Sequence, residues 1–432
     1  MSTFAQTYPG QAFARESVSG DILAFAIPCL QFLKFNVVGI LYASDLLLAI
    51  TFLYFAFSGK LKLSTSLSRK FVVLCAIWLG SQVVTDLIVH SAFADYARGW
   101  SRIITTLVSF CVLYPLLYGR SLRLLLYGWG LVIGGTLELL IDPGQWGKDY
   151  PWKFGLCFPV TLVAFLVASR KSSTAYSAII LSTLIGLINI AAGTRSRGGV
   201  CLVVALYLLL SLPARQKCSI PHAFKGRSVL AIVGGIALAI VAVLWVYDRA
   251  ANTGLLGGSA KEEYLQQSSG DYGVLLGGRS AILGSIPAIL DSPILGHGSW
   301  ARDPIYVLAQ MQAMAEMGYE NLSAVEEEEL DEGYIPAHSY LFGAWVEAGL
   351  AGAVFWGWIL IMALKIFFRA YPLSATLLPL AAFCALSLAW DVVFSPYGAQ
   401  QRLIVPYYVL MLMTVLGVEG LKRSTGAVGA DL

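Results

Sequence analysis

The chain has 432 residues, of which 57% are hydrophobic and only 13% are charged, and its mean hydropathy is +0.72. Soluble domains carry about 25% charged residues, so this composition excludes an ordinary soluble protein and predicts an all-α polytopic membrane protein surrounded by lipid. The formal net charge of +3 gives no indication of a nucleic-acid partner, and the seven cysteines lack metal-ligand spacing. We therefore expect no metal, no cofactor and no bound nucleic acid.

Apolar runs long enough to cross a hydrocarbon core of roughly 30 Å as a helix recur along most of the chain. We count about twelve such spans; Lys34 and Asp45 interrupt the first two, so a re-entrant segment is the alternative there. The approximate bounds of the predicted spans are residues 21–38, 41–58, 71–90, 101–118, 122–141, 154–169, 174–193, 198–212, 229–247, 339–366, 373–392 and 403–419.

The charges in the connections predict the orientation of these spans. Loops rich in lysine and arginine stay on the cytoplasmic side. Five alternate connections hold fourteen basic and no acidic residues, namely Lys60, Lys62, Arg69, Lys70, Arg120, Arg123, Arg170, Lys171, Arg215, Lys217, Lys225, Arg227, Lys365 and Arg369. We therefore expect both termini in the cytoplasm.

One long connection, residues 248–338, lies on the outer side in this topology. It carries fourteen Asp or Glu against four Lys or Arg, and a connection of this length is typical of a folded unit with a task. The chain is thus predicted to have three regions: about nine spans in residues 1–247, the outer loop unit, and about three spans in residues 339–432.

Two arginines in the sequence GTRSRGG (193–199) stand where the outer end of one predicted span meets the start of the next. Basic residues are disfavoured on the outer side, and cations are disfavoured at a helix N-terminus. A bound anion would resolve both conflicts, because guanidinium groups, helix amides and the hydroxyls of Thr194 or Ser196 suit phosphate oxygens. The alternative is that Arg195 and Arg197 only reach toward lipid headgroups.

The outer loop contains two further candidate segments. In GGRSAILGSIPAILDSPILGHGSW, Arg279 precedes an amphipathic helical stretch that ends near Asp291, and His297 stands in a turn between two glycines. In IPAHSYLFGAWVEAGLAG, His338 stands directly before a predicted span, with Tyr340 following it at the start of that span.

The series SRGG, GGRS…DSPILGHG and PAHSYL…EAGLAG resembles the O-antigen ligase and polymerase superfamily of bacterial membrane glycosyltransferases, over roughly residues 190–355. That resemblance implies a GT-C type fold in the bacterial inner membrane, with the outer loop in the periplasm. It also implies a donor glycan linked to undecaprenyl diphosphate, with Arg197 and Arg279 holding the diphosphate and His338 helping to activate the acceptor hydroxyl.

Elementary chemistry agrees with these implied roles. Cleavage of a sugar–diphosphate bond develops negative charge that guanidinium groups stabilise, and histidine is a suitable general base for a hydroxyl. Because the sequence has no DxD motif and no cluster with metal spacing, we expect metal-independent transfer with inversion, active in EDTA. The other binding candidates are Arg195, Thr194, Ser196, His297, Tyr340 and Arg402, and we favour His338 over His297 as the base.

Three functional hypotheses follow. The leading one is a polymerase that transfers a lipid-linked glycan to another lipid-linked repeat unit. A ligase that transfers the glycan to lipid A core is close behind, and some relatives glycosylate protein. The alternative from another class is a transporter or flippase, which would concentrate ionisable groups and broken helices near the bilayer midplane.

Overall fold

The protein is described by a computed structural model that covers residues 17–170, 174–217, 279–319, 332–367 and 376–428, with isolated residues between 222 and 270 and the pair 369–370. Within these residues the elements are helices, apart from two short antiparallel β ladders. The expected all-α class is therefore confirmed for the described part of the chain. The predicted span at residues 229–247 lies mostly outside the described residues.

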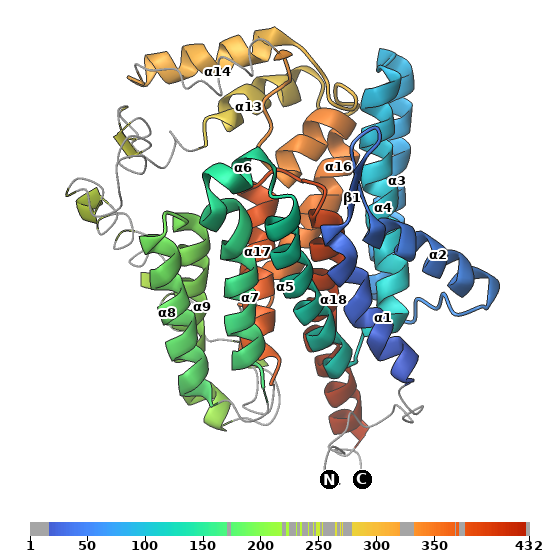
Figure 1. The fold of residues 1–432 in the computed structure, drawn as a ribbon, viewed down its shortest axis with the longest axis vertical. Coiled ribbons are helices and arrows are strands. Elements are labelled where there is room, and N and C mark those ends of the chain that lie inside the picture. The colour runs from blue at the N-terminus through green and yellow to red at the C-terminus, as the bar shows by residue number, and fades with distance from the viewer. Residues whose placement is uncertain are drawn as a thin grey trace.

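The first predicted span differs from expectation. Its helical part ends early, and a short hairpin follows before the next helix; the elements are α1 (Val18–Cys29), η1 (Leu30–Phe32), β1 (Lys34–Asn36), β2 (Ile40–Tyr42) and α2 (Ala43–Phe57). Lys34 starts the hairpin and forms a 3.0 Å ion pair with Asp142, far away in the sequence. This ion pair joins the hairpin to the C-terminal end of α5, and α2 projects sideways from the bundle (Figure 1).

The next part of the chain forms a bundle of antiparallel helices. Its elements are α3 (Ser66–Val89), α4 (Phe93–Leu117), α5 (Ser121–Ile141), α6 (Gly144–Asp149), the π-helical turn η2 (Trp152–Leu156), α7 (Cys157–Ala168), α8 (Ala175–Ala191) and α9 (Arg195–Lys217). A β ladder between β3 (His222–Ala223) and β4 (Arg369–Ala370) follows.

The outer loop supplies two helices, α13 (Ala281–Asp291) and α14 (Pro304–Glu316). They pack over a small apolar cluster of Ala288, Ile289, Tyr306, Ile335 and Val346. The helix predicted after Arg279 is thus confirmed, and it ends at the predicted residue. Both helices lie at one end of the bundle, whereas α1 begins and α18 ends at the opposite end (Figure 1).

The last three helices complete the bundle and are α16 (Tyr340–Leu364), α17 (Leu378–Phe394) and α18 (Gln401–Val428). Helix α17 lies at the centre, in contact with α7, α9, α16 and α18, and thirteen of its seventeen residues are buried. A helix that is apolar on all sides is buried in this way. Polar side chains on α17 therefore face the interior of the protein rather than lipid.

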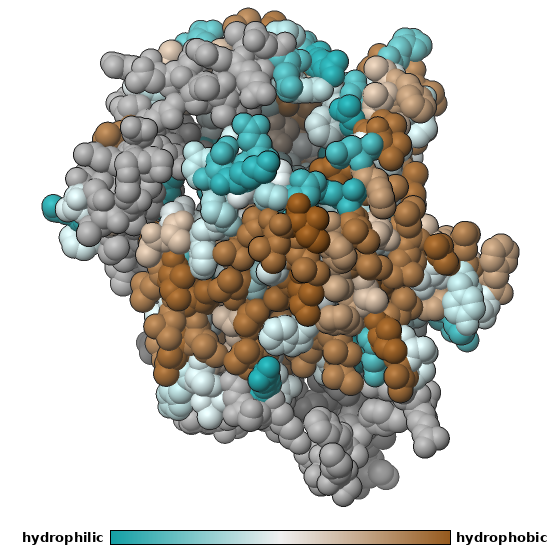
Figure 2. Space-filling model, in the orientation of Figure 1, coloured by the Kyte–Doolittle hydropathy of each residue, from teal (hydrophilic) through white to brown (hydrophobic). Residues whose placement is uncertain are grey.

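Five described helices are long and apolar enough to cross a membrane: α3, α4, α5, the Arg195–Leu212 part of α9, and α16. Seven shorter apolar helices accompany them in the described residues. On the face that Figure 2 shows, hydrophobic side chains form a broad band over the helices, and hydrophilic ones gather above this band, toward the end that carries α13 and α14. These features indicate a membrane-embedded protein, while the count of twelve spans stays a prediction.

The glycines of two loop motifs have a structural explanation. Helix α16 is interrupted at Gly349, whose φ of 62° and ψ of −152° are accessible essentially to glycine alone. The interruption leaves carbonyls without partners in the helix, and the amides of His297 and Gly298 donate to those of Val346 and Glu347 at 2.7 and 3.1 Å. The LGHG turn is thereby joined to the kink in α16.

Candidate functional site

Four side chains on the last two turns of α17 form the centre of the candidate site. Ser387, Trp390, Asp391 and Phe394 follow the spacing i, i+3, i+4, i+7, which places them along one face of the helix. At 1.5 Å per residue this stripe is about 10 Å long. The stripe ends at the helix C-terminus, where the helix dipole favours cations.

Arg197 contacts the inner part of this stripe. It belongs to the first turn of α9, and its Nη1 donates a 3.0 Å hydrogen bond to Oγ of Ser387. Its guanidinium group lies 5.8 and 5.9 Å from the ring centroids of Phe158 and Phe383, and its charge interacts with that of Asp391. An aromatic and hydroxyl environment orients the guanidinium group while it remains charged.

Arg279 contacts the outer part of the same stripe. Its guanidinium carbon lies 5.4 Å from the ring of Trp390 and 5.6 Å from that of Phe394. Burial, together with the positive charge of Arg195, lowers the pKa of Arg279. The structure therefore brings three arginines together at the C-terminal end of α17, and guanidinium groups in such an arrangement can bind an anion.

His338 joins this group from the segment that precedes α16. The neighbouring Ser339 donates a 2.8 Å hydrogen bond from its hydroxyl to the carbonyl oxygen of Val392, which fixes the segment against α17. Desolvation by the neighbouring protein atoms and the charge of Arg279 lower the pKa of His338 below its usual value of 6.5, although the residue as a whole is exposed to solvent. A histidine in this state is neutral at pH 7 and can accept a proton.

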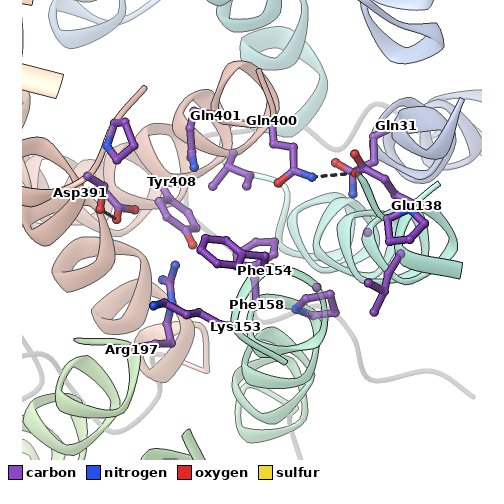
Figure 3. A pocket seen from close by; sticks show the side chains of 18 residues that line it. Gln31, Glu138, Lys153, Phe154, Phe158, Arg197, Asp391, Gln400, Gln401 and Tyr408 are labelled. Atoms are coloured by element: carbon purple, nitrogen blue, oxygen red, sulfur yellow. Dashed lines mark hydrogen bonds between the residues drawn. The ribbon is translucent and has the colours of Figure 1, made fainter. Parts of the chain in front are cut away.

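A cavity of about 320 Å³ opens beside Arg197. Its lining residues come from η1, α5, η2, α7, α9, α17 and α18: Gln31, Gly135, Glu138, Leu139, Pro143, Lys153, Phe154, Gly155, Phe158, Pro159, Arg197, Asp391, Ser395, Pro396, Gln400, Gln401, Ile404 and Tyr408. Arg197 and Lys153 lie at one end, below Asp391 and Tyr408 (Figure 3). Binding sites for small ligands begin at about this size.

The other end of the cavity is also polar but carries no cation. Gln31, Glu138 and Gln400 gather there, and Gln400 donates a 2.7 Å hydrogen bond to Glu138 (Figure 3). The rings of Phe154 and Phe158 lie between the two ends. The cavity therefore has a cationic end and an end rich in amide and carboxylate groups.

Sequence reasoning missed these cavity residues. Glu138 and Asp391 stand inside predicted apolar spans, and an ionisable residue within a membrane helix is itself an indication of a functional site. That signal could have found both carboxylates. Lys153 and Gln400 carry no comparable signal, because they stand in connecting segments with ordinary polar composition.

The small residues around Arg197 have structural contacts. Thr194 is buried, and its hydroxyl donates a 2.8 Å hydrogen bond to the carbonyl of Asn189; Ser196 is half-buried in the first turn of α9. Gly198 faces α8, where a Cβ atom would collide with Ile190 and the Gly186 carbonyl. Gly198 therefore serves the close packing of α8 and α9.

Two other binding candidates lie away from the cavity. Nε2 of His297 is 2.7 Å from the carbonyl oxygen of Ala288, so that nitrogen donates a hydrogen bond within the outer unit. Arg402 forms a 3.1 Å ion pair with Asp45 and donates to the carbonyl of Ile40 at 2.7 Å, with both charged side chains buried. These contacts stabilise the fold, and neither residue belongs to the candidate site.

Tyr340 lies behind the site. Its side chain is buried against the rings of Trp356 and Tyr397, with centroids 4.9 and 5.0 Å away. Among the described residues its hydroxyl has no hydrogen-bond partner. Tyr340 therefore supports the packing of α16 against α17 and is near enough to Asp391 for their charges to interact.

The described residues contain no group of three or more His, Cys, Asp or Glu side chains that could hold a metal ion. Comparisons with models of known protein families and with curated proteins find no match for this chain. The function must therefore be argued from the site.

Proposed function

We propose that the protein is an inner-membrane glycosyltransferase that uses a glycan linked to undecaprenyl diphosphate as its donor. The observation that carries this proposal is the convergence of Arg197, Arg279 and His338 on the outer half of α17. The two guanidinium groups contact one face of α17, and each can bind phosphate oxygens through paired hydrogen bonds.

The proposed reaction is a single displacement at the anomeric carbon. His338 takes the proton of the acceptor hydroxyl, and the acceptor oxygen attacks the anomeric carbon from the side opposite the diphosphate. The new carbon–oxygen bond forms as the sugar–phosphate bond breaks, so the configuration inverts and undecaprenyl diphosphate leaves. Arg197 and Arg279 stabilise the charge that develops on the leaving oxygen, a contribution of typically 10²- to 10³-fold per donor.

The position of the site favours an enzyme over a transporter. The cationic residues meet the last two turns of α17, at the end of the bundle that carries α13 and α14 (Figure 1). A transporter concentrates ionisable residues and broken helices near the midplane of the bilayer. We propose that this end faces the periplasm and that both chain termini are cytoplasmic.

The identity of the acceptor distinguishes a polymerase from a ligase. We favour a polymerase of the O-antigen type, with a second lipid-linked repeat unit as acceptor, in a GT-C type bundle of about twelve spans. A lipid A core acceptor would make the protein an O-antigen ligase. Parallel assays with the two acceptors separate these activities, because each activity gives a different product.

The experiment is transfer by the purified protein in lipid nanodiscs, with a lipid-linked donor and both acceptors, in EDTA. Arg197→Ala and Arg279→Ala are expected to reduce the rate about 10²- to 10³-fold. Arg302→Ala is the matched control, because Arg302 is an exposed arginine of the outer unit that contacts Tyr334. Wild-type rates in both site variants would overturn the proposal, as would activity that disappears in EDTA and returns with Mg²⁺.

A further inference from the structure

The amide and carboxylate end of the cavity is organised for hydroxyl groups. Glu138 accepts a 2.7 Å hydrogen bond from Nε2 of Gln400 and a 3.4 Å hydrogen bond from the hydroxyl of Tyr42, one on each carboxylate oxygen. Each oxygen of an ionised carboxylate can accept about two hydrogen bonds. The carboxylate is therefore held in place by the protein and keeps the capacity to accept donors from a ligand.

Gln401 gives a second indication of a ligand. Its side chain lines the cavity, and its Oε1 atom is buried with no hydrogen-bond partner in the described residues. A buried acceptor without a partner destabilises the protein. Because this oxygen has almost no accessible surface, the amide group of Gln401 must rotate before the oxygen can accept a hydrogen bond from a hydroxyl group in the cavity; a phosphate oxygen, which is itself an acceptor, offers it no hydrogen bond.

The walls between the two ends suit a sugar ring. Phe154, Phe158 and Tyr408 supply aromatic surface next to these polar groups. A pyranose presents C–H groups on its faces and hydroxyls at its edge, so it can pack on aromatic rings while its hydroxyls meet carboxylate and amide oxygens. A volume of about 320 Å³ corresponds to roughly ten waters, which admits one sugar with its phosphate but not a whole glycan.

We propose that this end of the cavity is the subsite for the first sugar of the donor, with Glu138 and Gln401 accepting hydrogen bonds from its hydroxyls. The inference rests on the proposed function, because the first sugar is bonded directly to the diphosphate that Arg197 is proposed to hold. Lys153 and Arg197 lie together at the cationic end of the cavity, so we expect the phosphates to bind at that end (Figure 3). The sugar would then bind at the opposite end.

The test measures binding of two kinds of lipid to the full-length protein in nanodiscs. One probe is undecaprenyl diphosphate alone, and the others carry a single glucose, galactose, rhamnose or N-acetylglucosamine. Glu138→Gln keeps the shape of the side chain. We expect it to lower the affinity for the preferred sugar-bearing lipid about tenfold, which is the effect of losing one hydrogen bond to a charged acceptor. Gln401→Leu is expected to lower the affinity for the same lipid about threefold to tenfold.

Binding of the lipid without sugar is expected to stay unchanged in both variants. Asp149→Asn is the matched control, because Asp149 is exposed at the end of α6 and does not line the cavity. Equal affinities of wild type and Glu138→Gln for every sugar-bearing lipid would overturn the subsite, as would a wild type that prefers none of the four sugars over the bare lipid. If the wild type bound neither kind of lipid, both the proposed function and the sugar subsite would be overturned.

Discussion

Two arginine sites in the bundle show how differently one residue type can be used. Arg402 is buried in a 3.1 Å ion pair with Asp45 and donates to two backbone carbonyls, so its hydrogen bonds serve the fold. Arg197 contacts the hydroxyl of Ser387 and two aromatic rings beside an open cavity. The contacts of the guanidinium group, rather than its place in the sequence, distinguish a structural arginine from a ligand-binding one.

This contrast predicts that variants of the two sites fail in different ways. Variants at the α17 site should lose transfer and keep stability. Variants at the Arg402 site should lose stability, and any loss of transfer should follow from it.

The largest effect is expected for His338→Gln. Loss of the general base is expected to reduce transfer about 10²- to 10⁴-fold, while the melting temperature in detergent stays at the wild-type value. The neutral form of His338 accepts the proton, so wild-type activity should be constant above pH 6.5 and fall as the pH drops through the lowered pKa. The pH profile of kcat/KM, which reports groups of the free enzyme, measures this, and the acidic limb should be absent from the variant. A wild-type limb centred above pH 6.5 would contradict the assignment.

The next effect concerns Arg402→Ala. Removing the arginine leaves the carboxylate of Asp45 buried without its partner, which is expected to cost about 3–5 kcal/mol of stability. Thermal unfolding in detergent measures this loss of stability. The double variant Arg402→Met with Asp45→Asn should recover most of the loss, because it removes both charges. A stable Arg402→Ala protein with no transfer would show instead that Arg402 binds the substrate.

A smaller effect tests the junction between the outer unit and the bundle. Gly349→Ala places a Cβ atom against the Ile294 carbonyl, in a backbone conformation that costs an alanine on the order of 1–3 kcal/mol. Limited proteolysis near residues 292–298 should become faster. Gly357→Ala is the control, because a Cβ atom at that position meets no other atom within 4 Å. Equal cleavage rates in both variants would contradict the proposed role of the kink.

The sequence predicted features that depend on nearby residues. The helical period after Arg279 predicted α13, and the conflict of Arg195 and Arg197 with two local rules marked the start of α9 as unusual. Those rules act within a few residues of the chain. They could therefore be applied before any contact was known.

Features that depend on distant residues were not predictable in this way. The first span is replaced after Phe32 by a hairpin whose Lys34 pairs with distant Asp142, and the role of Gly198 is set by α8 across a helix interface. The sequence indicates Arg402 as a candidate phosphate ligand, because its ion pair with Asp45 joins two distant parts of the chain and is not visible there. Glu138 and Asp391 were missed because hydropathy averages hide single carboxylates within apolar spans.

The most direct test of the central claim is a cryo-EM map of the protein in nanodiscs with undecaprenyl diphosphate bound. We expect density for the diphosphate between Arg197 and Arg279, alongside Trp390 and Asp391 on α17, within hydrogen-bond distance of at least one guanidinium group. Diphosphate density elsewhere, for instance beside Arg402 or at the opposite end of the bundle, with the α17 site empty, would contradict it.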